Sequence, residues 1–174
     1  NGKLFKVANL MGAEKDAEEF PLNFKYRNNI EGLAANSDGN LLLAVKERNL
    51  DNRGDYKGIY EFDPRTKKLN MDPAIKINYN DPAFDVLKTG NPRKLIRPSD
   101  LAFHPKSKEL YVLDAEFQKI LILKESGKIK ELHLLDPEEF PQPEGICFSP
   151  SGRMFISNES LGGPPTLLEL KFIN

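Results

Sequence analysis

Short apolar segments separated by polar turns run through most of the chain. The clearest of them are 41–46, 109–114 and 119–124. Each has the length of a β-strand, and the turns between them contain Gly, Pro, Asp or Lys. The 13 Pro and 12 Gly also indicate frequent turns and few long helices. The pattern therefore predicts an all-β fold.

One strand–turn–strand pattern occurs three times, at 29–45, 98–113 and 143–157. It starts with an acidic residue or Ser, then Gly or Asp, and continues as two apolar strands joined by a polar turn. Taking Gly32, Asp100 and Gly145 as equivalent gives spacings of 68 residues (32 to 100) and 45 residues (100 to 145). The shorter spacing is typical of a four-stranded β-propeller blade of about 40–45 residues. The longer one requires an insertion, for which 49–57 and 78–94 are candidates.

These repeats predict a single β-propeller domain over 1–174, made of four-stranded antiparallel blades. The expected blades are at about 29–77, 97–135 and 142–174, with 1–10 as an extra outer strand. We also expect a short acidic helix over 13–20. A β-sandwich is the alternative for strands of this kind, but three similar copies at blade spacing favour the propeller.

A ring of propeller blades usually has about 4–8 members. About three and a fraction blades are expected here, so the prediction is a partial propeller. The rest of a larger propeller, or another chain, would complete the ring. The chain begins with Asn1 and not Met, and we expect a processed or partial product.

Composition excludes several classes of function. The 25 Lys and Arg balance 26 Asp and Glu, so the net charge of −1 gives no reason to expect a nucleic-acid partner. The longest apolar run, 41–45, is too short to span a membrane. Cys147 is the only cysteine, which excludes an internal disulfide and a CxxC site. Its position within an apolar strand predicts an inert packing residue.

Four tracts carry a family resemblance: 29–34, 96–105, 135–146 and 156–160 with Gly162–Gly163. They resemble the SdiA-regulated family of bacterial proteins over about 29–172, and Phe-Pro-Gln-Pro-Glu-Gly at 140–145 is the most specific tract. The chain is similar to the C-terminal half of these longer proteins. The resemblance implies a β-propeller exported to the periplasm, the cell envelope or the exterior. The chain departs from the family pattern at the two insertions and at Asp100, where the flanking repeats have Gly.

Acidic side chains stand where the innermost strands begin. Glu31, Ser99 and Glu144 occupy equivalent positions, and Asp100 follows Ser99. In a propeller these strand starts gather at one mouth of the central channel. Carboxylates gathered there repel one another, and a hard cation such as Ca²⁺ would relieve the repulsion. We expect a Ca²⁺ site at Glu31, Asp100 and Glu144. The alternative is that each carboxylate accepts backbone N–H bonds at the strand start.

Charged residues also follow the second strand of each repeat, where loops are expected. They are Lys46, Glu47, Glu116 and Glu159. Arg97 lies just before an inner strand, and its planar guanidinium suits a carboxylate or phosphate ligand. These five residues are the candidate ligand-binding set for a small anion. The alternative is a salt-bridge network among Arg97, Glu47 and Glu116.

Motifs of nucleophilic catalysis are missing from the sequence. It has no Gly-x-Ser-x-Gly, His-Glu-x-x-His or Gly-rich phosphate loop. His104 ends an inner strand and His133 lies on an outer strand, so neither is expected to act as a general base. The leading hypothesis is a non-enzymatic binding or scaffold propeller, with Ca²⁺ in its channel, that recognises a protein or a small anionic ligand through its loops and edges.

Two other functions stay open at this point. Glu31-Gly32 and Glu144-Gly145 are similar to the metal modules of propeller hydrolases, which makes a Ca²⁺-dependent lactonase or phosphotriesterase the main alternative. In such enzymes the metal polarises the substrate oxygen. A purely structural module that supports a neighbouring domain is the third possibility.

Overall fold

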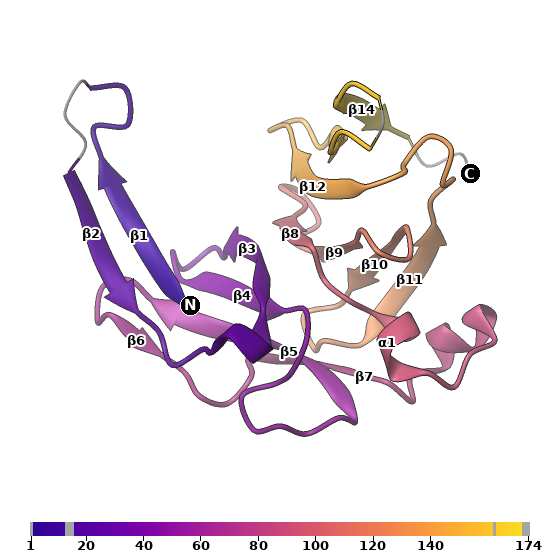
Figure 1. Ribbon diagram of the computed structural model, residues 1–174, viewed down its shortest axis with the longest axis horizontal. Coiled ribbons are helices and arrows are strands. Elements are labelled where there is room, and N and C mark those ends of the chain that lie inside the picture. The colour runs from indigo at the N-terminus through magenta and orange to yellow at the C-terminus, as the bar shows by residue number, and fades with distance from the viewer. Residues whose placement is uncertain (1, 13–15, 162, 172–174) are drawn as a thin grey trace.

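The computed structural model describes residues 2–12, 16–161 and 163–171. Its strands form four antiparallel sheets. In Figure 1 these sheets follow one another along an arc, in sequence order. No helix among the described residues is long and apolar enough to cross a membrane.

The first sheet after the N-terminal hairpin contains five strands. They are β3 (Ile30–Ala35), β4 (Leu41–Val45), β5 (Tyr56–Asp63), β6 (Lys68–Leu69) and β7 (Ile75–Asn78). The first four pair in sequence order, and β7 pairs with the other end of β5. Pro73 lies between β6 and β7, which are separate strands.

The next two sheets follow the repeat more simply. One has the order β8 (Asp100–Phe103), β9 (Leu110–Asp114), β10 (Lys119–Leu123) and β11 (Ile129–Leu134). The other has the order β12 (Pro143–Phe148), β13 (Met154–Asn158) and β14 (Thr166–Leu170). Strands β4, β9 and β10 agree to within a residue with the apolar segments predicted at 41–46, 109–114 and 119–124.

The N-terminal segment forms a hairpin, and here the helix prediction for 13–20 is wrong. Strand β1 (Lys3–Ala8) pairs with β2 (Asp16–Pro21), and residues 13–15 lie outside the described residues. Helix propensity is a weak signal that tertiary contacts readily override. Here the backbone of β1 supplies the hydrogen bonds of β2, and the Phe20 ring is buried against the first sheet.

The two inserted segments differ in structure. The loop between β4 and β5 contains residues 46–55, whereas the segment after β7 forms the short helices η2 (Pro82–Leu87) and α1 (Pro92–Leu95). A third short helix, η1 (Tyr26–Asn28), precedes β3. Phe84 and Leu95 join the core between the first two large sheets, so the second insertion covers one end of that core.

Strand β10 explains why successive sheets stack face to face. Its side chains alternate between two cores, as the period of two in a strand requires. Leu121 and Leu123 pack with Ile59 and Ile77 of the preceding sheet. Their neighbours Ile120 and Ile122 pack on the other side, in the core that contains Ile146, Met154 and Ile156 of the following sheet. The continuous apolar sequence of β10 therefore reflects burial on both faces.

The hairpin packs on the free face of the first sheet in the same manner. Phe20 and Phe24 contact Phe62 and Tyr60, with ring centroids 5.7 and 5.4 Å apart. The inner strands β3, β8 and β12 lie on the inner side of the arc in Figure 1, where β3 contacts β8 and β8 contacts β12. Stacked sheets with neighbouring inner strands are the arrangement expected of propeller blades.

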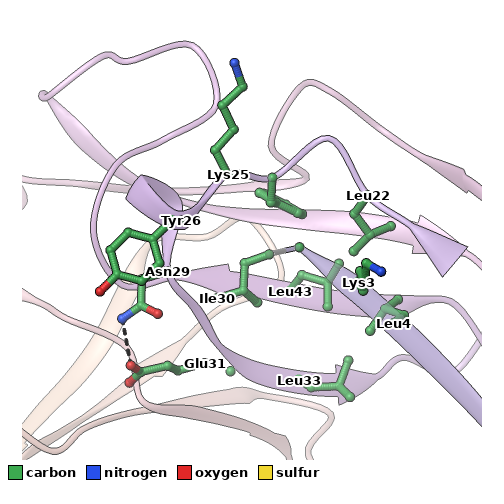
Figure 2. Close-up of a pocket in the computed structure, with 13 residues that line it drawn as sticks. Lys3, Leu4, Leu22, Lys25, Tyr26, Asn29, Ile30, Glu31, Leu33 and Leu43 are labelled. Carbon is green, nitrogen blue, oxygen red and sulfur yellow. Dashed lines mark hydrogen bonds between the residues drawn. The ribbon is translucent and has the colours of Figure 1, made fainter. Parts of the chain in front are cut away.

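The contact between the hairpin and β3 is open toward the inner side. A cavity of about 270 Å³ lies there, lined by Leu4, Leu22, Ile30 and Leu33 among others (Figure 2). Leu33 is 47% exposed although it lies on an inner strand. Within the described residues, only β2 pairs with β1, so the second edge of β1 is unpaired. This region has the apolar surface and free backbone that a further strand would cover.

We expect the isolated chain to self-associate through this hairpin. Phe5 and Val7 are 57% and 40% exposed on the face of β1 opposite Leu4. A Phe5→Lys/Val7→Lys double variant should shift the concentration-dependent mass in light scattering toward the monomer, because charges on an edge strand oppose pairing. Val86→Lys is the matched control, since Val86 is 60% exposed but outside any strand. An equal effect of both changes would contradict the assignment.

Candidate functional site

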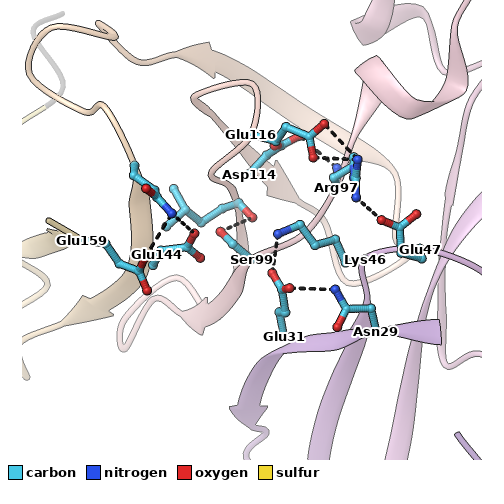
Figure 3. Close-up of polar contacts among 12 residues, drawn as sticks. Asn29, Glu31, Lys46, Glu47, Arg97, Ser99, Asp114, Glu116, Glu144 and Glu159 are labelled. Atoms are coloured by element: carbon cyan, nitrogen blue, oxygen red, sulfur yellow. Dashed lines mark hydrogen bonds and ion pairs between the residues drawn. The ribbon is translucent and has the colours of Figure 1, made fainter. Parts of the chain in front are cut away.

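Glu31, a predicted Ca²⁺ ligand, is paired with a cation. Its Oε2 lies 2.6 Å from Nζ of Lys46, and its Oε1 accepts a hydrogen bond of 2.8 Å from Nδ2 of Asn29 (Figure 3). Glu31 is the second residue of β3, and Lys46 directly follows the neighbouring strand β4. Pairing of the two strands therefore holds a predicted metal ligand against a predicted anion-binding cation.

The side-chain amide of Gln142 links two carboxylates in the sheet of β12, β13 and β14 and the loop after β13. Nε2 of Gln142 lies 3.4 Å from Oε1 of Glu144 and 3.1 Å from Oε2 of Glu159. Ser99, at the equivalent strand start in the second sheet, is buried, and its hydroxyl lies 3.3 Å from the carbonyl oxygens of Leu113 and Pro143. Among the described residues, the donors to Glu31 and Glu144 are side chains, whereas the alternative predicted backbone N–H donors; such a donor is found at Asp100.

Asp100 connects two inner strands. Its Oδ2 accepts a hydrogen bond of 2.9 Å from the backbone N–H of Ile146 on β12. Burial raises the pKa of the Asp100 carboxyl, and neighbouring backbone N–H groups, that of Ile146 first, offset part of the rise. A Cβ at Gly145 would lie 2.5 Å from Oγ of Ser157. A side chain at this position of β12 would therefore displace a neighbour beside the Asp100 contact.

The three predicted metal ligands have different partners. Within residues 2–12, 16–161 and 163–171, no group of three or more His, Cys, Asp or Glu side chains is placed to hold a metal ion. Glu31 would have to exchange its Lys46 partner for the metal. Calcium binding by Glu31, Asp100 and Glu144 stays a prediction.

Arg97 forms the salt-bridge network that the sequence offered as an alternative to ligand binding. The side chain is 10% exposed, its Nη1 lies 2.6 Å from Oε2 of Glu116, and its Nη2 pairs with Oε1 of Glu47. Nη2 of Arg93 lies 3.5 Å from the other oxygen of Glu47. Figure 3 shows Arg97, Glu47 and Glu116 in the same view as the Lys46–Glu31 pair. The network is confirmed, and both predicted anion-binding cations have acidic partners.

A buried ion pair contacts the backbone of Arg97, and the sequence analysis did not predict it. Nζ of Lys119 lies 2.8 Å from Oδ2 of Asp114, with exposed fractions of 1% and 0%. The same oxygen accepts the backbone N–H of Arg97 at 2.9 Å, and Oδ1 accepts that of Phe117 at 3.0 Å. Burial lowers the pKa of Lys119, an effect that Asp114 opposes. The sequence did contain a signal for it, because Lys119 is the first residue of an otherwise apolar strand.

A second buried lysine, Lys57, was also missed. It is 3% exposed, and its Nζ donates hydrogen bonds of 2.7 Å to the carbonyl oxygens of Lys46 and Glu47. Burial lowers its pKa to about 8, while the Glu47 carboxylate opposes the shift. Its sequence position, at the end of a polar insertion, suggested a solvent-exposed side chain.

The histidines have structural contacts, as expected, whereas the prediction for Cys147 is wrong. Nδ1 of His104 accepts the backbone N–H of Ser107 at 3.0 Å, and its ring packs edge-on against Phe148. Nε2 of His133 lies 2.9 Å from Oε2 of Glu131. Cys147 is exposed, because the alternation along β12 buries its neighbour Ile146 and turns the thiol to the other face.

Among solved structures, the likeness to a gluconolactonase-like β-propeller supports the class of fold. Virginiamycin B lyase from Staphylococcus aureus, a β-propeller, is 15% identical over 90% of this chain and 46% of the lyase, with a TM-score of 0.48. A gluconolactonase-like protein is 14% identical over 90% and 53%, with a TM-score of 0.50. A protein of unknown function from Bacteroides caccae is 14% identical over 83% and 46%, with a TM-score of 0.51.

At these identities the likeness concerns the fold, and the chain spans about half the length of these proteins. The chain is a β-propeller protein. A family model for SdiA-regulated proteins matches residues 5–162, so the chain belongs to the SdiA-regulated family. Both were predicted from the repeats and the tracts above. A search of curated proteins gives no match.

The Asp114–Lys119 pair should be the costliest polar contact to break. Asp114→Ala leaves the Lys119 amine buried without a partner, and we expect a loss of about 3–5 kcal/mol in the free energy of unfolding. Urea denaturation measures it, with the exposed Asp72→Ala as control. In a double-mutant cycle, adding Lys119→Met should recover part of the loss. A loss below about 1 kcal/mol, the range of surface pairs, would contradict a buried pair.

Asp100 should act as a structural link. Asp100→Ala removes the acceptor of the Ile146 N–H, and the expected loss is about 1–3 kcal/mol in the free energy of unfolding. Asp100→Asn should cost less, since its amide oxygen can accept the same bond. Equal stability of the Ala variant and the wild type, again by urea denaturation, would show that this contact is dispensable.

Proposed function

We propose that this chain is the binding half of an exported β-propeller scaffold, and that it recognises its ligand without transforming it. The carrying observation is the set of fixed ion pairs at the strand ends, Lys46 with Glu31 and Arg97 with Glu47 and Glu116. Their geometry is set by strand pairing and by the buried Asp114. A surface whose side chains are already held in place loses less entropy on binding.

The same contacts count against a hydrolytic role. A general base or a metal ligand needs a carboxylate that can accept a proton or a cation during the reaction. Glu31 accepts from Lys46 and Asn29, and Glu144 accepts from Gln142. Metal binding would have to overcome these interactions before any substrate is polarised.

The proposal also includes an exported location and a Ca²⁺ site, each of which is supported by a single observation. Export to the periplasm or cell envelope follows from the family resemblance alone. Ca²⁺ at Glu31, Asp100 and Glu144 would require rearrangement of the first pair, and the Glu-Gly sequences at 31–32 and 144–145 are its main support. The Ca²⁺-dependent lactonase or phosphotriesterase is therefore the competing function that the test below addresses.

Turnover assays on the full-length protein separate the two functions. With lactone and phosphotriester substrates and millimolar Ca²⁺, we expect no turnover. Ca²⁺-dependent turnover that is lost in Glu144→Gln would establish the hydrolase instead.

The Glu31→Gln variant adds a readout of the ion pair itself. If Glu31 serves as the partner of Lys46, the variant should lose about 1 kcal/mol of stability or less, equally with and without Ca²⁺. If Glu31 is a metal ligand, the variant should instead abolish a stabilisation by Ca²⁺ that the wild type shows. Lys128→Met changes an exposed residue and controls for effects of mutation that do not involve this ion pair.

A further inference from the structure

Two lysine side chains are buried in the described part of the chain, and their environments differ. Lys119, 1% exposed, has the carboxylate of Asp114 at 2.8 Å. Lys57, 3% exposed, contacts the carbonyl oxygens of Lys46 and Glu47, and no described carboxylate lies within ion-pair distance of its amine. A buried charge is costly unless it is paired. Lys57 is therefore the buried cation whose charge is left least compensated.

Lys57 lines a cavity of about 220 Å³ between the β4–β5 loop and α1. Most of its charged lining residues are cations, namely Lys46, Arg48, Arg53, Lys57, Arg93 and Arg97. The only carboxylate among the lining residues is that of Glu47, and it is already paired with Arg97 and Arg93. The charge of this cavity thus favours an anion.

Two residues that line the cavity carry hydrogen-bond donors without a partner among the described residues. Nε of Arg97 is buried and has no hydrogen-bond partner among the described residues. The Tyr79 hydroxyl, another lining group, has none in the same part of the chain. Burial raises the pKa of Tyr79 to about 12, so this hydroxyl keeps its proton near neutral pH. Unsatisfied donors in a cationic cavity are what an oxyanion would complete.

The loop that bounds the cavity is held in shape by a buried side chain. Nδ2 of Asn49 donates to the carbonyl oxygens of Arg53 and Tyr56 at 3.0 and 2.7 Å, and its Oδ1 accepts the Gly58 N–H at 2.8 Å. The Arg53 guanidinium is in turn fixed by the carboxylate of Asp55. The cavity walls therefore need little ordering when a ligand enters.

We propose that this cavity binds a small ligand through a carboxylate or phosphate group, with the Lys57 ammonium as the central charge and the Tyr79 hydroxyl as a neutral donor. The inference rests on the proposed binding function and names its ligand class. It also revises the candidate set, since Lys46 and Arg97 contribute to the positive potential while their own charges are compensated by Glu31, Glu47 and Glu116.

The pH dependence of binding follows from the same geometry. The charged groups that act on the Lys57 amine are Glu47 and Asp114, which stabilise its protonated form, and Arg97 and Arg93, which destabilise it. Its pKa of about 8 means that the free cavity loses this charge as the pH rises above neutrality. An anion bound beside the amine raises that pKa, so anion affinity must fall between pH 7 and 9.

The test is a titration followed by ¹H–¹⁵N NMR at constant ionic strength, with inorganic phosphate in one arm and succinate in the other. Saturable shifts at 46–58, 79 and 92–97, absent with chloride, are expected. The anion that binds more tightly, phosphate or succinate, identifies whether a phosphate or a carboxylate group is preferred. Shifts that do not saturate, or that scatter over exposed lysines, would overturn the proposal. Neither probe can be hydrolysed, so this outcome is independent of the turnover assay.

Variants and pH locate the binding groups. Lys57→Met should abolish saturable binding, whereas Lys128→Met at an exposed position should leave it unchanged. Tyr79→Phe, which removes only a hydroxyl without a partner, should weaken binding by about 3–10-fold. Succinate stays fully ionised from pH 7 to 9, and its affinity should fall by about 10-fold over that range. Unchanged affinity in Tyr79→Phe together with a flat pH profile would refute the assignment even if Lys57→Met does not fold.

Discussion

The middle sheet, β8 to β11, buries apolar side chains on both of its faces, and this requirement shapes the rest of the molecule. A fully buried Leu or Ile contributes about 1.5–3 kcal/mol relative to its exposed state. Leu121 and Ile120 can both be buried only if a sheet lies on each side. Face-to-face stacking in turn brings β3, β8 and β12 together along one axis. The polar groups at the strand ends are neighbours because the apolar strands stack.

The polar site depends on this packing in a second way. Asp114 ends β9 and Lys119 begins β10, so the register of one hairpin places both charges opposite each other in the interior. Asp114 also accepts the backbone N–H of Arg97, which holds the chain before β8 near Glu47 and Glu116. Strand pairing, a buried ion pair and the surface charge network thus form a single connected structure. A loss of register in this hairpin would displace the groups of the site together.

Sequence reasoning succeeded where a local pattern carries the information. The apolar alternation and the repeat spacing predicted most strands. A salt-bridge network among Arg97, Glu47 and Glu116 was one of two alternatives for the charged residues beside the strands. These features depend on residues near one another in the repeat. The family tracts, such as 140–145, belong to the same kind of local signal.

The failures depend on contacts between distant segments. β2 is a strand because β1 pairs with it, and the buried Lys57 lines a cavity together with Pro92 and Arg93 of the second insertion. Neither contact has a signature in the segment itself. Cys147 was misjudged for a related reason, since an apolar inner strand was expected to be buried on both faces although one side of β12 is open at this residue. Burial is decided by neighbours that the strand's own residues do not specify.

The exposed position of Cys147 has a practical consequence. It is the only sulfhydryl in the chain, and it lies on an innermost strand beside Ile146, the residue that hydrogen-bonds to Asp100. A fluorophore or spin label attached there would report on the axis of the fold without any engineered cysteine. Its signal would register changes where neighbouring inner strands meet, and distances to a second label on a partner or on additional blades would show how the ring is completed.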